Sequence, residues 1–385
     1  MSLIPMRPIL DATDTYSYAQ GAFNVNAVAQ AQAVIEIHNL FRSPAILQGA
    51  DLANGFMGGR KDFQNATVED KKLGALNIAR AVKQFAKDVP IPVALHLDHG
   101  RNLDSVKAAI DGGYTSVMID GSSLPLEDNI ALTREVVRYA HPLGVTVEGE
   151  LGVLAGVEDH VFSETSTYTN PLTAIRFLKA TKVDALAISY GTQHGANKGK
   201  NPKIRKEIAI AIKECMRHEG IQGVLVSHGS STVPQNVVEA INKLGGDIQD
   251  AGGISIEQLV EVSHLGIGKI NVDTDIRLAV TRNIREYFLE DTARQQEPSV
   301  KGVWDLLSAN PKFFDPRQYM TPLMDTMMYG TLPSEAVAEL MERVKRGVKE
   351  AVGTLIVQFG SVDKASKVRM RSLEEMADYY KQEGI

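Results

Sequence analysis

The sequence predicts a (β/α)8 barrel, which is an α/β fold. Short apolar runs alternate along the chain with longer segments of helical periodicity, the pattern of repeated strand–helix units. The runs number eight, which favours a closed barrel over an open sheet. Polar side chains collect at the carboxyl end of nearly every run, and a barrel of this kind builds its active site at that face.

The eight apolar runs are the predicted strands of the barrel. They show little polar–apolar alternation, as expected of parallel strands that are covered on both sides. In chain order they are residues 21–26, 43–50, 91–100, 116–121, 145–152, 185–195, 223–229 and 267–275. Amphipathic stretches between them predict the covering helices, among them residues 27–40, 75–85, 129–140 and 234–244.

The C-terminal hundred or so residues depart from the strand–helix alternation. The last barrel helix is predicted near residues 276–287, followed by a polar excursion over residues 289–300. Ser334 is placed to cap a long helix. Its apolar positions recur at helical spacing: Val337, Leu340, Met341, Val344, Val348 and Val352. We therefore expect a catalytic barrel over residues 1–285 and, over residues 286–385, a helical extension packed on the barrel or on a neighbouring subunit.

The composition excludes several classes of partner. A net charge of −6 leaves no electrostatic footprint for nucleic acid or an acidic membrane. No stretch approaches the roughly 18 uninterrupted apolar residues of a membrane helix, and residues 1–18 do not resemble a signal peptide. The single cysteine, Cys215, cannot form an intrachain disulfide, which is typical of a reducing compartment. The sequence predicts a soluble cytoplasmic protein.

The polar residues at the ends of the runs are the strongest functional signal. Strands often end in polar turn residues, which would explain an asparagine or a glycine but poorly explains three histidines and four carboxylates at equivalent ends. We therefore expect these side chains to form one site. They are Asn24, Asn26, Gln48, Asp98, His99, Asp120, Glu150, His194, His228, Asn271 and Asp273.

Three of the nine histidines, His99, His194 and His228, come from separate strand ends and are each followed by glycine. Imidazole nitrogens suit zinc, and three protein ligands leave one position open for substrate. Gly195 and Gly229, with the hydroxyls that follow Gly229, are placed to cradle a phosphate. We expect His96 to lie in the core or to support the ligands. Surface or packing roles are expected for His38, His141, His160, His218 and His264.

The segments GAFNVN, LHLDHG, SVMIDGS, VEGELG, GTQHG, SHGSS and KINVDTDIR resemble the motifs of class II fructose-bisphosphate aldolases, in the same order and at similar spacing. The resemblance runs from about Gly21 to Arg277. The tail segments FFDPRQYMTPLMDTM and FGSVDKASKV resemble the longer branch of that family.

The resemblance implies catalytic roles for the matching residues. His99, His194 and His228 would bind a catalytic Zn2+ ion. Asp98 would exchange the proton of the sugar's C4 hydroxyl, and Glu158, in the segment AGVED, would move the proton at the carbon nucleophile. A second divalent metal ion would be held with His99 by Asp120 and Glu150.

The resemblance also implies the substrate contacts. The phosphate of dihydroxyacetone phosphate would be surrounded by Gly195, Lys198, Gly229 and Ser231. The residues on the triose would be Asn24, Gln48, Asn271, Asp273 and Thr274. Arg277 would bind the distal phosphate. A monovalent cation near the first phosphate and assembly as a homodimer or homotetramer are further family properties.

The chemistry of the residues agrees with a metal-dependent aldolase. Cleaving a C–C bond beside a carbonyl leaves an enediolate, which is stabilised either through a lysine Schiff base or by a divalent metal ion. Lysines near the strand ends are few, with Lys198 after the sixth run and Lys269 inside the eighth, whereas the metal-binding set is complete. An alternative stays open for each of the two catalytic carboxylates. Instead of exchanging a proton, Asp98 would orient a ligand histidine. Instead of belonging to a mobile lid over residues 153–169, Glu158 would be a solvated surface acid.

One departure from the family pattern bears on the substrate. The family usually carries a serine after the second strand, where this chain has Ala50 followed by Asp51. The alanine removes a donor, and a carboxylate facing the site would repel a phosphate dianion. Arg277 would still allow the substrate to carry an anionic group at its distal end, because a guanidinium binds phosphate or sulfonate bidentately.

Four hypotheses follow. The first is reversible cleavage of fructose 1,6-bisphosphate, a step of glycolysis and gluconeogenesis. The second is the same chemistry on tagatose 1,6-bisphosphate or a sulfonated ketose phosphate. The third is a zinc hydrolase on the same barrel, and the fourth is a metal-binding scaffold without catalysis.

Overall fold

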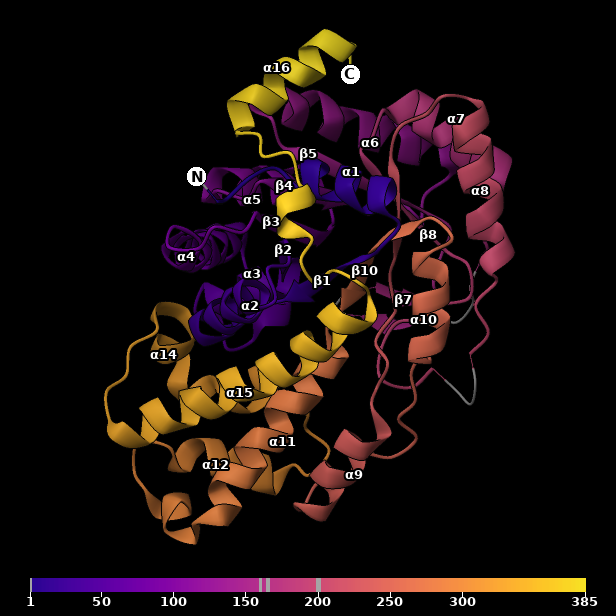
Figure 1. Ribbon diagram of the computed structural model, residues 1–385. Coiled ribbons are helices and arrows are strands. Elements are labelled where there is room, and N and C mark those ends of the chain that lie inside the picture. The colour runs from indigo at the N-terminus through magenta and orange to yellow at the C-terminus, as the bar shows by residue number, and fades with distance from the viewer. Residues whose placement is uncertain (1, 159–160, 164–166, 199–201) are drawn as a thin grey trace.

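The computed structural model describes residues 2–158, 161–163, 167–198 and 202–385. Within these residues, eight parallel strands close into a barrel in the order β1-β10-β9-β8-β5-β4-β3-β2 (Figure 1). The strands are β1 (Gln20–Asn24), β2 (Ala45–Ala50), β3 (Val93–Gly100), β4 (Ser116–Ile119), β5 (Thr146–Leu151), β8 (Ala185–Ile188), β9 (Val224–Ser227) and β10 (Ile267–Val272). The predicted barrel and all eight predicted strand regions are confirmed.

Helices cover the outside of the barrel, as predicted. They are α2 (Val28–Leu40), α4 (Val68–Ala86), α5 (Leu103–Gly112), α6 (Leu126–Ala140), α7 (Pro171–Thr181), α8 (Lys206–His218), α9 (Gln235–Lys243), α10 (Ile256–Ser263) and α11 (Thr274–Glu290). Smaller elements lie over the carboxyl ends of the strands: α3 (Asp51–Met57), the short 3-10 helix η1 (Phe63–Asn65), and the hairpin of β6 (Gly156–Glu158) and β7 (Val161–Ser163). These elements enclose the site.

The sixth strand is shorter than predicted. The apolar run suggests a strand to residue 195, but β8 ends at Ile188, where its partner β5 ends at Leu151. Gly191 then adopts a left-handed backbone (φ +111°), which turns the chain out of the sheet. His194 therefore lies on a loop beyond the strand end.

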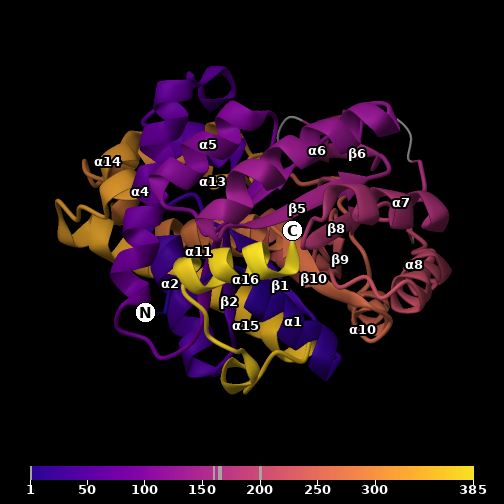
Figure 2. The same ribbon diagram turned by 90° about the horizontal axis from the view of Figure 1, so that it is seen from above.

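Helix α1 (Arg7–Tyr16) closes the amino-terminal mouth of the barrel and lies outside the predicted elements. Its apolar residues Ile9 and Leu10 pack with small side chains that point into the barrel, such as Ala94 and Ala187. The Arg7 guanidinium donates to the buried Asp184 carboxylate at 2.8 Å. The C-terminal helix α16 (Leu373–Glu383) covers the same end, as Figure 2 shows.

The predicted helical extension is present and packs on the barrel of the same chain. It comprises α12 (Lys301–Ala309), α13 (Pro316–Tyr319), α14 (Met324–Tyr329), α15 (Glu335–Gln358) and α16. Ser334 caps α15 by accepting a hydrogen bond from the Val337 backbone N–H, as expected. The apolar stripe of α15 is buried, and Figure 1 shows this helix lying along α11. Helix α11 continues to Glu290, so residue 285 lies within it.

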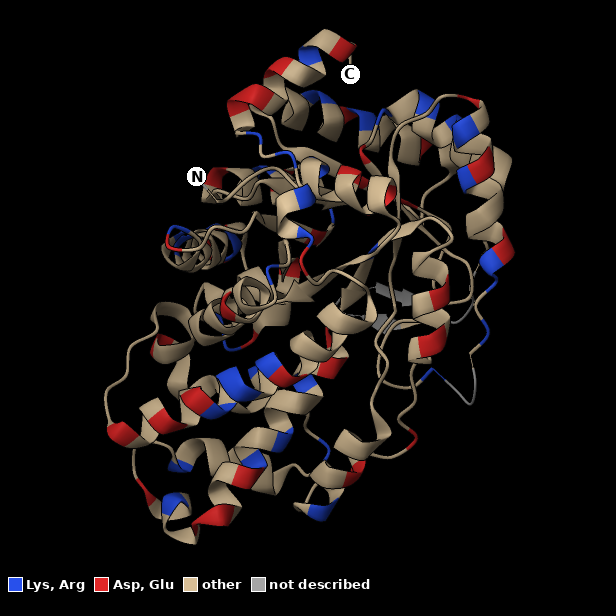
Figure 3. Ribbon diagram, viewed as in Figure 1, with Lys and Arg blue, Asp and Glu red and all other residues tan. Residues whose placement is uncertain are grey.

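The outer surface carries both signs of charge. Lysine and arginine alternate with aspartate and glutamate along the outer helices visible in Figure 3. No helix among the described residues has the length and apolar character needed to span a membrane.

The contact between α15 and α11 makes a stability prediction. A Cβ added at Gly347 would lie 2.7 Å from the Ala279 carbonyl oxygen, so Gly347→Ala forces the helices apart. We expect its free energy of unfolding to fall by about 1–3 kcal/mol. Gly353 is the matched control in the same helix, because its added Cβ meets its nearest atom, on Ile37, at 3.4 Å. Chemical denaturation of both variants checks the prediction, and equal stabilities would contradict it.

Candidate metal centre and active site

A bulge in β3 places two neighbouring side chains in one site. Leu97 pairs with Val117 and Gly100 with Ile119, so β3 carries one more residue than β4 over this stretch. His99, within the bulge, has a left-handed backbone (φ +48°), which is strained for any residue except glycine. Consecutive strand residues normally face opposite sides of a sheet. The bulge instead turns both Asp98 and His99 toward the same point.

Imidazole and carboxylate groups converge at the mouth of the barrel. Ligand atoms of Asp98, His99 and His228 lie within 4.8 Å of one another. The His99 ring centroid is 4.8 Å from that of His228 and 5.4 Å from that of His194. His194 approaches from the loop after β8 and lies outside the 4.8 Å group. The three histidines named by the sequence are thus neighbours in space.

A second group of ligand atoms, within the same 4.8 Å limit, comes from His99, Asp120 and Glu150. His99 Nδ1 is 3.2 Å from Asp120 Oδ2 and 3.9 Å from Glu150 Oε2. Asp120 also accepts hydrogen bonds from the Ser122 backbone N–H and hydroxyl. The two groups share His99, so this residue stands between two candidate metal positions.

The carboxylates control protonation in the site. Burial lowers the pKa of His99, but the neighbouring carboxylates, first Asp98 and then Asp120, outweigh it and raise that pKa well above its ordinary value. Burial, together with repulsion from Asp120, raises the pKa of Glu150 well above its usual range. The site thus concentrates negative charge that a bound cation would stabilise.

Two imidazole nitrogens are oriented as metal ligands. His228 Nε2 lies 2.9 Å from the Glu148 carboxylate, which is ionised and can only accept, so Nε2 carries the proton and Nδ1 offers a lone pair. His228 Nδ1 and His99 Nε2 are buried and make no hydrogen bond with the described residues. Buried nitrogens left without a hydrogen bond, beside carboxylates, match the donor set of a zinc-type ion.

Amide side chains hold Asp98 from two directions. The Asn271 amide donates to Asp98 Oδ1 at 3.1 Å, and the Asn24 amide lies 3.4 Å from Oδ2. Gln48 donates to the Asn24 carbonyl oxygen at 2.7 Å. Asp98 is therefore fixed next to the histidines with both oxygens engaged, and three predicted triose contacts form its support.

A cavity of about 560 Å³ opens beside this cluster at the carboxyl ends of the strands. Asn271 belongs to its lining and to the network on Asp98, so it joins the two. The predicted residues that line the cavity are His194, Gly195, Lys198, Gly229, Ser231, Asn271, Asp273, Thr274 and Arg277. The structure thus brings the predicted phosphate contacts and three of the five predicted triose contacts together around one space next to the histidines. The other two, Asn24 and Gln48, are not among the described residues that line it.

One wall of the cavity is a cradle of glycine and hydroxyl groups. Gly229 is left-handed (φ +60°), and an added Cβ would lie 2.5 Å from the Gln193 carbonyl oxygen. Only glycine permits this approach between the loops after β9 and β8. Ser231 accepts a hydrogen bond from the Thr274 backbone N–H. The Lys198 side chain is buried against the same loop, where its ammonium donates to the Gln193 carbonyl oxygen.

The chain is similar to known proteins along most of its length. Residues 4–364 match the family model described as "Fructose-bisphosphate aldolase class-II". The fructose-bisphosphate aldolase of Giardia intestinalis is 37% identical over 385 residues, covering 99% of this chain and 100% of that protein. The chain belongs to the class II fructose-bisphosphate aldolase family.

Other relatives and solved structures extend the comparison. The fructose-bisphosphate aldolase of Thermus caldophilus is 37% identical and covers 93% of this chain and 98% of its own length. The crystal structure of the YdjI aldolase from Escherichia coli K12 has a TM-score of 0.64 at 25% identity, covering 94% of this chain and 99% of that one. The fructose-bisphosphate aldolase of Campylobacter jejuni has a TM-score of 0.66 at 20% identity over 94% and 97%, which shows the shared fold.

The lining of the aldolase cavity also contains residues that the sequence analysis did not single out. Arg317, from the C-terminal extension, lines it together with Arg277. The Arg317 guanidinium lies 2.8 Å from the Asp315 carboxylate, and the Arg277 guanidinium lies 3.2 Å from it. Arg277 also pairs with Asp273. The Arg317 guanidinium lies 4.9 Å from the ring centroid of Phe63 in η1. The tail segment FFDPR carried the only sequence signal for Arg317.

The structure also shows where Ala50 and Asp51, which differ from the family pattern, lie relative to the cavity. Asp51 is buried at the start of α3, and its carboxylate accepts from the Lys71 ammonium at 2.5 Å. Neither Ala50 nor Asp51 is among the described residues that line the cavity, whereas Leu52 is. The pairing with Lys71 offsets the negative charge that was expected to repel a phosphate.

Glu158 lies at the end of β6, where its backbone pairs with Val161 of β7 in an antiparallel hairpin. Its side chain is outside the description. His160 lies outside the described residues altogether. Gly156, at the start of the hairpin, packs against the His194 backbone. A Cβ added to Gly156 would lie 2.4 Å from the His194 carbonyl oxygen. The hairpin that carries Glu158 therefore begins in contact with the loop of a predicted ligand.

Two of the remaining histidines, His96 and His141, are buried. His96 is fully buried, with Nδ1 2.8 Å from the Ser116 hydroxyl and Nε2 3.5 Å from Glu148. His141 is buried and stacks on Tyr380 of α16 at 3.8 Å. Both positions agree with the core and packing roles expected from the sequence.

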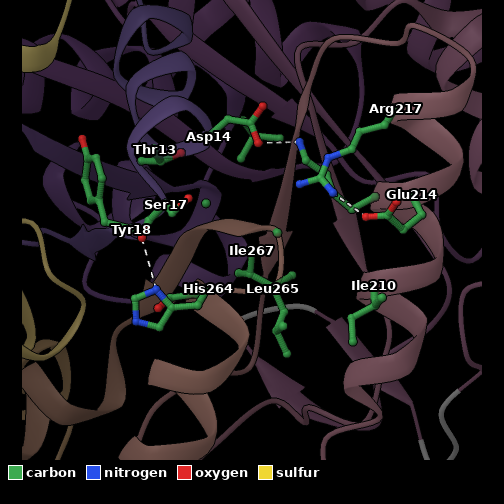
Figure 4. Close-up of a pocket in the computed structure, with 15 residues that line it drawn as sticks. Thr13, Asp14, Ser17, Tyr18, Ile210, Glu214, Arg217, His264, Leu265 and Ile267 are labelled. Carbon is green, nitrogen blue, oxygen red and sulfur yellow. Dashed lines mark hydrogen bonds and ion pairs between the residues drawn. The ribbon is translucent and has the colours of Figure 1, made fainter.

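A smaller cavity of about 150 Å³ lies at the opposite end of the barrel, between α1, α8 and the start of β10 (Figure 4). Its charged side chains are paired with each other: Lys213 with Asp14 at 2.6 Å, and Arg217 with Glu214. None of the described residues that line it belongs to the predicted site. It is therefore not a candidate for the aldolase chemistry.

The metal centre predicts a change in metal content. If His228 is a ligand, His228→Ala removes one of the groups that hold the ion, so the purified variant should retain much less divalent metal than the wild type. His218→Ala, at a side chain that is 87% exposed, should keep it. Elemental analysis after dialysis against a weak chelator measures both. Equal metal content in the two variants would exclude His228 as a ligand.

Proposed function

We propose that this protein reversibly cleaves fructose 1,6-bisphosphate to dihydroxyacetone phosphate and glyceraldehyde 3-phosphate. The observation that carries the proposal is a single cavity whose lining combines a phosphate cradle with two arginines, and a histidine–carboxylate cluster beside it. Family membership supports it, because the relatives are named fructose-bisphosphate aldolases. A zinc hydrolase would leave the cradle and the arginines without a role.

The proposed cofactor is Zn2+, held by His99, His194 and His228. When bound, such an ion acts as a Lewis acid that stabilises negative charge on the substrate oxygens during C–C cleavage. Asp120 and Glu150 are proposed to hold a second divalent ion with His99, which fits their shared cluster.

Asp98 is the proposed general base of cleavage. It would take the proton from the C4 hydroxyl of the open-chain sugar as the C3–C4 bond breaks, leaving the aldehyde and an enediolate electron pair at C3. The amide of Asn271 holds one Asp98 oxygen, and that of Asn24 lies next to the other. Glu158 is the proposed acid that protonates C3 to complete dihydroxyacetone phosphate, delivered by the β6–β7 hairpin. In the synthetic direction the two residues exchange roles.

Two groups of residues in the cavity lining would bind the two phosphates. The cradle at Gly195, Gly229 and Ser231, with Lys198, suits the phosphate of the triose half. Arg277 and Arg317 suit the distal phosphate, because each presents a guanidinium that can bind an anion bidentately.

A second candidate substrate is favoured by one observation. This chain has Ala50 where the family usually carries a serine, so that position has no side-chain donor for a distal phosphate. Tagatose 1,6-bisphosphate, the C4 epimer, or a sulfonated ketose phosphate would undergo the same cleavage. The choice concerns only the aldehyde half, since both candidates share the triose phosphate.

The proposal predicts cleavage of fructose 1,6-bisphosphate by the wild type and a loss of this activity when Asp98 is replaced. The zinc-loaded protein should cleave fructose 1,6-bisphosphate in a coupled assay, with a higher kcat/KM than for tagatose 1,6-bisphosphate. Asp98→Asn should reduce kcat by about 10²–10⁴-fold, because a positioned general base contributes on that order. Asp88→Asn, on the surface, is the control. A zinc-loaded wild type inactive on fructose 1,6-bisphosphate would exclude the first candidate.

The distal arginines predict selectivity for a second anion. Arg317→Met should lower kcat/KM for fructose 1,6-bisphosphate by roughly 10–100-fold, the size expected for losing a charged hydrogen bond. Cleavage of fructose 1-phosphate, which lacks the distal phosphate, should change little. Arg217→Met, an exposed arginine at the other end of the barrel, serves as control. Equal losses on both substrates would place Arg317 outside the distal subsite.

A further inference from the structure

A buried lysine–glutamate pair lies inside the barrel beneath the active site. Lys269 on β10 and Glu148 on β5 both have fully buried side chains, and Lys269 Nζ donates to Glu148 Oε2 at 3.0 Å. Neither residue is among the described residues that line the cavity. Removing two charges from water is costly, and an apolar pair of similar size often stabilises a fold equally well. Stability alone therefore does not explain this pair.

On one side, Lys269 determines how the Asn271 amide is oriented. Its ammonium donates to Asn271 Oδ1 at 2.8 Å, and an ammonium can only donate. The amide oxygen must therefore face Lys269, which leaves the amide N–H groups to face Asp98. With the amide reversed, its oxygen would meet the Asp98 carboxylate and two acceptors would oppose each other.

On the other side, Lys269 holds the Glu148 carboxylate. Lys269 Nζ donates to Glu148 Oε2 at 3.0 Å, and the other carboxylate oxygen, Oε1, lies 2.9 Å from His228 Nε2. With the carboxylate held in this position, it accepts from His228 Nε2–H, so His228 presents Nδ1 to the metal position. One continuous series of hydrogen bonds thus joins Asp98, Asn271, Lys269, Glu148 and His228.

We propose that Lys269 is a positioning residue that sets two features of the active site together: the orientation of the amide that holds Asp98, and the ring nitrogen that His228 offers to the metal. The kinetic half of the inference rests on the proposed aldolase function. The metal-binding half is independent of it. Because one ammonium serves both residues, losing it affects metal affinity and proton transfer at once.

The first experiment compares Lys269→Met with the wild type. Zinc affinity, measured by competition with a chromophoric chelator, should fall by about 10–100-fold, as is common when a ligand's supporting partner is lost. The kcat of the zinc-saturated variant should fall on the order of tenfold or more, with little change in KM, because the loss is in proton transfer. Wild-type zinc affinity and kcat in this variant would overturn the proposal.

The matched control is Lys213→Met. Lys213 is also buried, and its Nζ contacts Asp14 and the Gly223 carbonyl oxygen at the opposite end of the barrel. Its zinc affinity and zinc-saturated kcat should equal those of the wild type. Losses matching those of Lys269→Met would mean that removing any buried lysine suffices, and would overturn the specific role.

A double variant separates the two functions and covers the case in which Lys269→Met fails to fold. Lys269→Met with Glu148→Gln leaves no unpaired buried charge, and the new amide keeps an oxygen for His228 Nε2–H. Zinc affinity and the visible spectrum of the cobalt(II)-substituted protein should return close to the wild type, whereas kcat should stay low because Asn271 remains released. Full recovery of kcat, or zinc affinity that stays low, would overturn the coupling. A wild type that binds zinc but cleaves no ketose phosphate would instead refute the proposed function, leaving the zinc and cobalt measurements valid.

Discussion

The extra residue in β3 is the constraint on which the active site depends. A regular strand would turn Asp98 and His99 to opposite faces, one into the barrel and the other toward the helices. The bulge, with the left-handed backbone of His99, directs both to one point. Gly100 makes this possible, because any Cβ there would lie 2.4 Å from the Met118 carbonyl oxygen. The proposed general base and a proposed metal ligand, adjacent in the chain, thereby face the same site.

The rest of the site is arranged to support these two residues. Side chains two residues apart on a strand share a face, and two such pairs face the barrel interior. They are Glu148 with Glu150 on β5, and Lys269 with Asn271 on β10. Their charges are costly to bury, and they offset one another only through close hydrogen bonds. The interior of the barrel is accordingly divided. Small apolar residues and α1 fill its amino-terminal half, whereas the polar network occupies the half where chemistry is proposed.

The C-terminal extension contributes to the cavity as well as to stability. Helix α15 packs along α11, whose first turn carries Arg277. The segment between them brings Asp315 and Arg317 back to the cavity lining. Arg277 and Arg317 share Asp315, so this part of the lining is assembled from the barrel and the extension together. The extension therefore cannot be treated as an accessory to an otherwise complete site.

The sequence by itself determined the barrel, the helical extension and the identity of the histidine and carboxylate cluster. Periodicity and the position of polar residues at strand ends are local properties, so they can be read along the chain. The tertiary structure alone revealed the bulge at His99, the loop position of His194, the Asp51–Lys71 pair and the place of Arg317 in the cavity lining. Each of these depends on which distant segments meet. The proposed role of Lys269 is the clearest case. The sequence shows a lysine inside a strand, but its two acceptors, Glu148 on β5 and Asn271 on β10, are known only from how the side chains meet inside the barrel.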